Sequence, residues 1–450
     1  MIYLFSDHVV LGGISTPLEI CSALIIIRDQ SIETIERCSF PDLFDRSYFS
    51  EIQDLRGSIV SPAFVNAHTH LCMLAFRGIG GQQALTGNVV KDLYFHLEQN
   101  LLPSDVLAFT RLGAIEALMS GVGTVWEHYY HGAALIQGLE EVGLCGAIAP
   151  TLQDISGPGT ELLEDSIERT LELRHDQSKA EKGLVAVLGP HATDTVSDDL
   201  WMRIAELSEE HSLPIHSHIA QALDEVEYSY QHHSCSPMTR MHQLGLTQLK
   251  ESRLWVHGLF ISDAELLDLD PEKDHLGHCP SAQMQFGFPA HVNSWRNQNL
   301  KIVLGTDAGS CNDGINIQSE MRFFSAADSY SVTMGEPLHK FRQKNTLSRA
   351  NAVQTERQII FEMRKAHTSN EQLLASVWGN AGNLHPQLPV GALEEGRLAN
   401  IIVWDASHPC LWPNWDSLQG LAMSNATPAI QRIMLRGDWQ YDGEGYLSSR

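Results

Sequence analysis

The sequence lacks an excess of positive charge, and this absence excludes several classes of protein. Its 450 residues contain 30 Lys and Arg against 55 Asp and Glu, which gives a formal net charge of −25. Proteins that bind nucleic acid need a basic surface to neutralise phosphates. The same negative charge argues against affinity for anionic membranes. We therefore expect a small-molecule partner and neither nucleic acid nor a membrane.

The chain also lacks the marks of a secreted or membrane protein. Its eight cysteines are scattered and form no Cys-x-x-Cys pair, so we expect reduced, mostly buried thiols. The first residues have no basic start followed by a long apolar core, as a signal peptide would. No run reaches the roughly 18 apolar residues that a membrane helix needs. The cytoplasm is the expected location. The length and the 43% of hydrophobic residues suit a folded protein with a large core.

Apolar runs near both ends of the chain predict short strands. Residues 23–27 form a β-branched apolar run, and residues 399–404 form a similar one after two glycines. We expect residues 1–60 and 386–450 to pair into one small β-sandwich domain. Residues 61–385 would then be inserted between the two halves.

The middle of the chain alternates apolar strands with helix-like stretches. The strand candidates end near eight positions, namely His68, His128, Pro150, Pro190, His218, His257, Cys279 and Asp307. A helix is expected over residues 104–121, with Ser104 as its cap and Gly121 as its stop, and Ser197 opens another. Eight strands joined by crossovers predict an α/β fold, a (β/α)8 barrel of the TIM type with its chemistry at the strand ends.

The pair His68 and His70 follows the apolar strand residues Phe64 and Val65. Side chains at i and i+2 of a strand point to the same face, so the two rings can hold one metal ion. The chain has 22 His, so an accidental pair is the alternative.

Three further candidate metal-site residues strengthen the case for a metal. His218, His257 and Asp307 lie at other predicted strand ends. Imidazoles and a carboxylate gathered from separate strands are typical of a catalytic transition-metal site.

Five segments, in their order along the chain, resemble the amidohydrolase superfamily: residues 62–70, 189–192, 216–220, 255–258 and 304–310. The most similar branch holds cytosine, guanine and adenosine-type deaminases and triazine chlorohydrolases. The resemblance covers nearly the whole chain. It implies homo-oligomers as the family tendency.

The resemblance also implies a site with one divalent ion per chain, zinc or iron, held by His68, His70, His218 and Asp307. His257 would orient and polarise the attacking water, and Asp307 would take the proton of that water and pass it to the leaving group. His191 would hydrogen-bond the substrate. Two-metal relatives usually bridge their ions with a modified Lys on the fourth strand. Residues 183–188 contain no Lys, which agrees with a single metal.

One catalytic position departs from the family pattern. Deaminases of this branch carry His-x-x-Glu, and the Glu protonates the ring nitrogen under attack, whereas this chain has Gln221. An amide cannot pass on a proton, so Gln221 can serve the reaction and bind the substrate only through hydrogen bonds. Glu225 lies four residues on and is a candidate replacement acid. We favour the alternative that Glu225 is a solvated helix carboxylate. A second departure is the segment 278–283, where relatives show Asn-rich substrate contacts, so the substrate stays open.

Other polar residues allow two interpretations. His216 shares a strand face with His218 and is expected to be a structural residue at the barrel floor. Residues 127–131 could line a heterocycle pocket or simply pack in the barrel. The group His232, His233 and Cys235 could suggest a second metal, but a solvated loop is favoured.

The sequence thus predicts a metal-dependent hydrolase that cleaves a C–N bond by hydrolytic deamination of an amino-substituted nitrogen heterocycle. Chlorohydrolase-type displacement of another leaving group is one alternative. A catalytically silent scaffold on the same fold is the other. Retention of all four metal-ligand positions speaks against the silent scaffold, and Gln221 is the feature in its favour.

Overall fold

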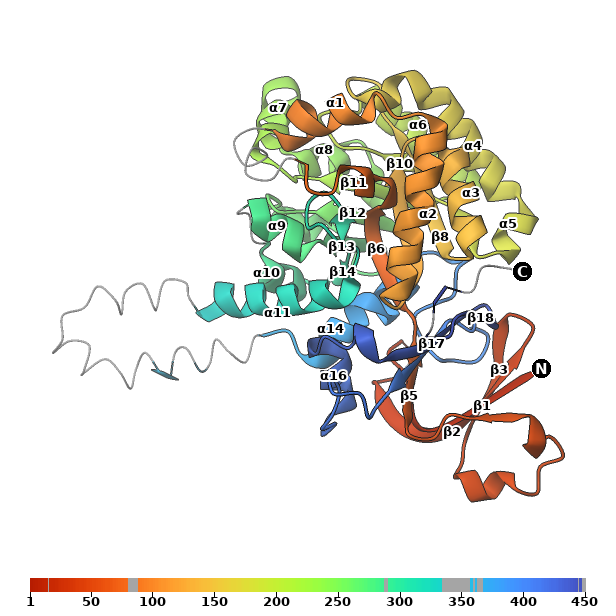
Figure 1. Cartoon of the computed structure of the whole chain (residues 1–450). Coiled ribbons are helices and arrows are strands. Elements are labelled where there is room, and N and C mark those ends of the chain that lie inside the picture. Colours follow the sequence, from red (N-terminus) through yellow and green to blue (C-terminus); the bar gives the residue numbers. More distant parts are fainter. Residues whose placement is uncertain are drawn as a thin grey trace.

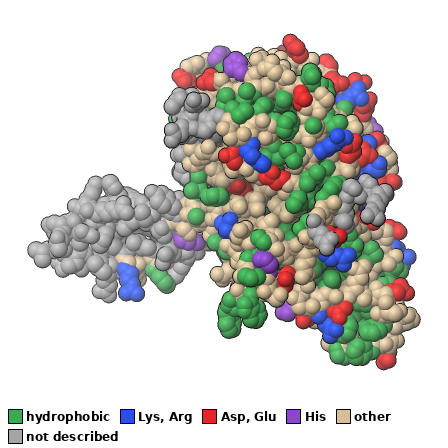
Figure 2. All heavy atoms as spheres, in the orientation of Figure 1, with side chains coloured by type: hydrophobic (Ala, Val, Ile, Leu, Met, Phe, Trp, Pro, Cys, Tyr) green, Lys and Arg blue, Asp and Glu red, His purple; other side chains and the backbone are tan. Residues whose placement is uncertain are grey.

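The computed structural model describes residues 1–14, 16–79, 88–286, 290–333, 357–358, 361, 367–443 and 445–446. The fold is mixed α/β, with two parallel sheets from the middle of the chain and one mixed sheet from its two ends. In Figure 1 the mixed sheet, drawn in red and blue, lies below the parallel strands and their helices. Acidic and basic side chains are interspersed on the face shown in Figure 2.

The mixed sheet joins strands from both ends of the chain. Its strands are β1 (Ile2–Leu11), β2 (Glu19–Arg28), β3 (Ser31–Arg37), β4 (Ile52–Asp54), β5 (Ser58–Pro62), β16 (Ile401–Asp405), β17 (Ile430–Leu435) and β18 (Asp438–Tyr441). Their order is β18-β17-β16-β5-β1-β2-β3, with β4 also paired to β1. The antiparallel pairing of β5 with β16 joins a strand from each end of the chain. The domain boundaries and the sandwich arrangement stay predictions.

The parallel strands form two sheets. One contains β6 (Phe64–His70), β7 (Val122–Tyr129), β8 (Cys145–Leu152), β9 (Leu184–Ala186), β10 (Gly189–Pro190) and β15 (Asp307–Ala308). The other contains β11 (Ile215–Ile219), β12 (Arg253–His257), β13 (Asp274–His278) and β14 (Lys301–Leu304). A parallel bridge between Leu188 and Ile215 joins the two sheets. The predicted strand ends fall close to the observed ones, because long apolar runs mark buried parallel strands.

Helices connect and cover these strands (Figure 1). They are α1 (Phe95–Glu98), α2 (Pro103–Met119), α3 (Gly132–Val142), α4 (Leu163–His175), α5 (Gln177–Glu181), α6 (Asp198–His211), α7 (Leu223–His233), α8 (Pro237–Gln243), α9 (Pro280–Phe286), α10 (Val292–Asn297), α11 (Ile317–Thr333), α14 (Asn370–Val377), α15 (Gly379–Gly382) and α16 (Ser417–Met423). Short turns include η3 (Leu71–Phe76) and η5 (Val90–Tyr94). Within the described part of the chain, no helix combines the length and the apolar character needed to cross a membrane.

The two predicted helix caps have different outcomes. Ser197 caps α6, since its hydroxyl accepts the N–H of Leu200 at 3.2 Å. The prediction for Ser104 is wrong, because α2 begins one residue earlier at Pro103. Proline suits the first helical position, where its missing N–H is not needed. The carboxylate of Asp105 instead accepts the N–H of Leu102 at 2.9 Å.

A short segment after β14 ties the last parallel strand to the first. The side-chain amide nitrogen of Asn66 donates to the Thr306 hydroxyl at 2.8 Å, and the backbone N–H of Thr306 donates to the side-chain oxygen Oδ1 of Asn66 at 3.1 Å. Gly305 lets the two backbones approach, since a Cβ there would lie 2.6 Å from the His68 carbonyl oxygen. In the pairing of β15 with β6, Asp307 lies opposite Thr69. This contact therefore places Asp307 beside the histidines of β6.

We expect Gly305→Ala to lower the free energy of unfolding. The added methyl group would collide with the backbone and Cβ of His68, and overpacking of this kind costs about 1–3 kcal/mol. Gly445→Ala is the control, because a Cβ added at Gly445 would meet no heavy atom within 4 Å. Urea denaturation of both variants checks the prediction. Equal stability of Gly305→Ala and the unmodified protein would contradict the close approach.

Candidate metal centre and substrate cavity

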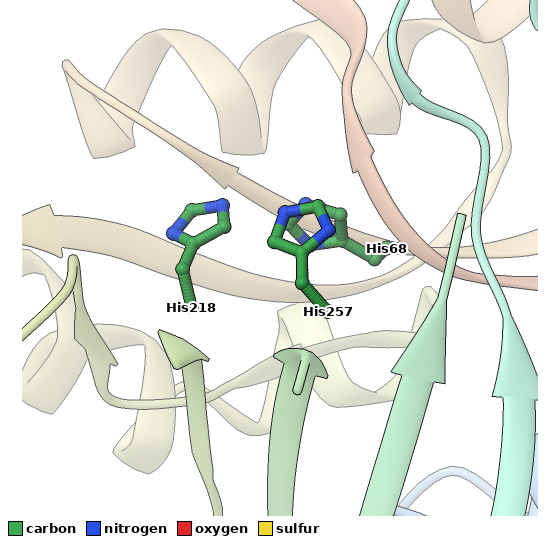
Figure 3. Close-up of side chains that lie close together, drawn as sticks. All are labelled: His68, His218 and His257. Carbon is green, nitrogen blue, oxygen red and sulfur yellow. The ribbon is translucent and has the colours of Figure 1, made fainter. Parts of the chain in front are cut away.

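Five predicted site residues come together at the carboxyl ends of the parallel strands. They are His68 and His70 of β6, His218 of β11, His257 at the end of β12, and Asp307 of β15. All five are buried. Figure 3 shows the rings of His68, His218 and His257 around one shared space. Their nearest ring nitrogens lie within 4.8 Å of one another, and the same holds for ligand atoms of His68, His70 and Asp307.

The distances between these atoms suit a single ion. His70 Nε2 lies 3.3 Å from His218 Nε2 and 3.6 Å from Asp307 Oδ1, and His68 Nε2 lies 3.9 Å from that oxygen. Tetrahedral zinc with bonds of about 2.0–2.2 Å separates its ligand atoms by about 3.3–3.6 Å. The four side chains therefore fit a divalent ion with small adjustments.

Two of the histidines are held in the tautomer that metal binding requires. The His70 Nδ1–H donates to the carbonyl oxygen of His128 at 2.5 Å, and the His218 Nδ1–H donates to that of His191 at 2.8 Å. A carbonyl only accepts, so each Nε2 keeps its lone pair. Burial lowers the pKa of both rings, which keeps them neutral and able to bind a metal.

His68 has an imidazole as its partner. Its Nδ1 lies 2.8 Å from Nε2 of His216, a buried neighbour on the same strand as His218. The Nε2 of His68 has no hydrogen-bond partner among the described residues. A buried polar atom without a partner is costly, and a metal ion at this point would satisfy it. His216 thus contacts a candidate ligand directly, which its spacing from His218 alone did not reveal.

The backbone is strained at two of these positions. His257 has a φ of 76° and Asp307 a φ of 58°, in the left-handed region that residues other than glycine rarely adopt. Such conformations cost on the order of 1–3 kcal/mol each and cluster at functional sites. The surrounding pairing of strands holds both residues there.

A cavity of about 460 Å³ opens beside the cluster. Its walls include His70, His218, His257 and Asp307, together with the two predicted substrate residues His191 and Gln221. Burial lowers the pKa of His191 to about 3, so its ring is neutral. The Nδ1 of His191 lies 2.9 Å from the Thr195 hydroxyl. The volume is large enough for a heterocyclic substrate.

The favoured interpretation of Glu225 is wrong. This residue is buried in the first turn of α7 and is not a solvated carboxylate. It accepts the backbone N–H of Gln221 at 2.8 Å and the hydroxyl of Thr193 at 2.5 Å. Burial, with a contribution from nearby Asp194, raises its pKa to about 7. Its four-residue distance from Gln221 is the one sequence feature that pointed to this contact.

The two alternatives for residues 127–131 each hold for part of the segment. His128, Tyr129 and Tyr130 line the cavity. Glu127 instead accepts the backbone N–H of Leu71 at 3.0 and 3.1 Å, which is a structural role. The segment therefore combines pocket lining with barrel packing.

The predicted loop at His232 and His233 is wrong, because both residues form the last turn of α7. His232 is exposed, and His233 lies 3.6 Å from the carboxylate of Asp198. Neither belongs to a group of potential metal ligands in the described part of the chain.

The sequence motifs did not identify the part of the cavity wall that η5 and α1 form. Lys91 lines the cavity and pairs with Asp194 at 2.7 Å. Glu98 also lines it, and burial raises the pKa of its carboxyl to about 7. Nothing in the spacing of residues 91–98 predicts that this stretch lies over the strand ends.

Comparisons with known proteins agree with this architecture. The model of the Amidohydrolase family matches residues 59–358. A 5-methylthioadenosine/S-adenosylhomocysteine deaminase of Halothermothrix orenii is 27% identical over 92% of this chain and 88% of its own. A protein of the same name from Pyrococcus abyssi is 29% identical over 61% of this chain, and the match spans 64% of that relative.

Among solved structures, the zinc-complexed atrazine chlorohydrolase TrzN of Arthrobacter aurescens TC1 superimposes with a TM-score of 0.79. The match covers 100% of this chain and 97% of that one at 18% sequence identity. At this identity the likeness concerns the fold alone.

We expect protein purified without added metal to contain about one divalent ion per chain, since the candidate ligands His68, His70, His218 and Asp307 in the described part of the chain form one tetrahedral set. Removing two ligands with His218→Ala and Asp307→Ala together should abolish this content. His232→Ala, at an exposed helix end, is the control and should retain it. Elemental analysis of the three proteins checks the prediction. A ratio near two, or metal retained in the double variant, would refute it.

Proposed function

The chain belongs to the amidohydrolase family, and on this basis we propose that it deaminates an amino-substituted nitrogen heterocycle by hydrolysis of a C–N bond. The sequence-based prediction of this family is confirmed. The observation that supports the proposal most is the convergence of four buried ligand groups beside a cavity: His68, His70, His218 and Asp307. These four residues are proposed to hold one zinc or iron ion.

The names of the sequence relatives favour an aminopurine substrate. Two relatives are named as deaminases of 5-methylthioadenosine and S-adenosylhomocysteine, both of which contain an adenosine group. We therefore propose substrates of the adenosine type as the first candidates. The match over nearly the whole length of the Halothermothrix orenii relative supports this choice.

The residues around the cluster divide the chemistry between them. A divalent ion bound there supplies a Lewis acid that lowers the pKa of a water toward neutrality. The Asp307 carboxylate would accept a proton from the attacking water and deliver it to the leaving amine. His257 would orient that water, and the neutral His191 ring would hydrogen-bond the substrate.

Gln221 is proposed to bind the substrate and not to move a proton. It lines the cavity directly after β11, and its amide can donate or accept hydrogen bonds only. Glu225 is a poor replacement acid, because both of its oxygens already accept hydrogen bonds from Thr193 and Gln221. The substrate ring would then meet an amide where related deaminases have an acid.

Gln221 also keeps the second candidate function open. Displacement of another leaving group, as in a chlorohydrolase, needs less proton transfer to a ring nitrogen than loss of ammonia does. The fold is proposed to be a closed (β/α)8 barrel, with the sheet of the chain ends as its small β domain. The cytoplasmic location and the homo-oligomeric state stay predictions.

The metal-loaded protein should release ammonia from one class in a panel of purines and their nucleosides, pterins, pyrimidines and aminotriazines. Adenosine-type nucleosides are expected to react fastest. A coupled ammonia assay measures the release, and chloro-substituted triazines with halide detection cover the second function. The double variant His218→Ala with Asp307→Ala is the control and should be inactive. Release of neither ammonia nor halide from any compound would contradict the proposal.

Gln221→Glu should reduce the rate with the native substrate. If the amide donates a hydrogen bond to the substrate, the change replaces a donor by an anion and leaves a polar group unpaired. Such a loss costs on the order of 1–3 kcal/mol, or about 5- to 150-fold in kcat/KM. Gln231→Glu, on an exposed position of α7, is the matched control. Activity of Gln221→Glu at or above that of the unmodified enzyme would refute the donor role.

A further inference from the structure

His257 differs from the candidate ligand histidines in the partner of its Nδ1. His70 and His218 each face a backbone carbonyl with Nδ1, which requires a proton on that nitrogen. The Nδ1 of His257 instead lies 3.3 Å from the amide nitrogen Nε2 of Gln283. An amide nitrogen only donates, so the Nδ1 of His257 must accept.

Gln283 is placed by its helix to make this contact. It lies in α9, which begins directly after the end of β13, and its side chain is buried at 3% exposure on the cavity wall. It belongs to the segment 278–283, in which the chain departs from the family pattern. Among the described residues, no other side chain is hydrogen-bonded to the ring of His257.

The surroundings of the two amide atoms of Gln283 differ. The side chain of Gln283 also interacts with His278, where it opposes the burial that lowers the pKa of His278 to about 3. Among the described residues, Oε1 of Gln283 and Nδ1 of His278 each lack a hydrogen-bond partner. The amide nitrogen is thus the atom of the Gln283 side chain that has a hydrogen-bond partner, and this partner is the ring of His257.

We propose that Gln283 is a positioning residue that fixes His257 as the neutral tautomer with its proton on Nε2. This inference rests on the proposed hydrolytic function. With Nδ1 occupied as an acceptor, the Nε2–H of His257 can only donate toward the shared space of the cluster. His257 would thus hold the attacking water by a hydrogen bond to its oxygen and would not serve as a metal ligand.

The tautomer also determines where the proton of the water goes. A ring that donates through Nε2 and accepts through Nδ1 from Gln283 has no free lone pair for that proton. Among the described residues of the cluster, the Asp307 carboxylate is then the group left to act as base. Gln283 would in this way separate the two roles: His257 orients the oxygen, and Asp307 takes the proton.

The tautomer of His257 can be measured directly in the metal-loaded protein. In protein labelled with 15N-histidine, long-range 1H–15N spectra distinguish a protonated from an unprotonated ring nitrogen. The resonances of His257 are those lost in His257→Asn. We expect Nε2 protonated and Nδ1 unprotonated. Gln283→Glu should reverse the pattern, because a carboxylate only accepts and would draw the proton to Nδ1. A proton on Nδ1 in the unmodified protein would overturn the proposal.

Kinetics give the second readout. Gln283→Met removes the donor at similar volume and should lower kcat by about 10- to 100-fold, with little change in KM or metal content. Gln318→Met is the matched control, since Gln318 is a buried amide that donates to the Leu421 carbonyl away from the site. Unchanged kcat in Gln283→Met, or loss of its metal, would overturn the positioning role. If the unmodified enzyme turns over no substrate, the proposed function fails, while the spectra still decide the tautomer.

Discussion

The site depends on one contact, the pairing of β6 with the segment that follows β14. Asn66 and Thr306 exchange two hydrogen bonds there, and Gly305 removes the side chain that would keep the backbones apart. Without this contact, Asp307 and the histidines of β6 would have no fixed relation, since they lie far apart in the sequence. The carboxylate of Asp307 can complete the set of candidate metal ligands only because β15 pairs with β6.

The candidate ligands are oriented largely by the backbone of neighbouring strand ends. The carbonyls of His128 and His191 set the tautomers of His70 and His218, although their own side chains line the cavity. Each of these two residues thus contributes to the metal centre through its backbone carbonyl and to the substrate cavity through its ring. Substitution of such a side chain would leave the carbonyl in place, so metal binding and substrate binding can vary separately in this architecture.

Much of this arrangement could be predicted because it depends on local patterns. Apolar runs mark the parallel strands, and the motifs around His68 and Asp307 mark their functional ends. The burial of Glu225 could not be predicted, because it depends on Thr193, a residue of another loop. The contact of His216 with His68 likewise joins separate strands, and that of Gln283 with His257 joins a helix to a strand end. The helix start at Pro103 could not be placed, because a serine cap and a proline at the first position compete in the same stretch.

The pairing of β5 with β16 has a consequence for the synthesis of the chain. The strand Ser58–Pro62 is synthesised well before its partner Ile401–Asp405, because most of the parallel strands and their helices lie between the two in the sequence. At roughly 5–20 residues per second, the nascent chain carries an open strand edge for tens of seconds. Open edges invite pairing with other chains. The shortness of β5 and its terminal proline, which offers no N–H, limit that risk while translation continues.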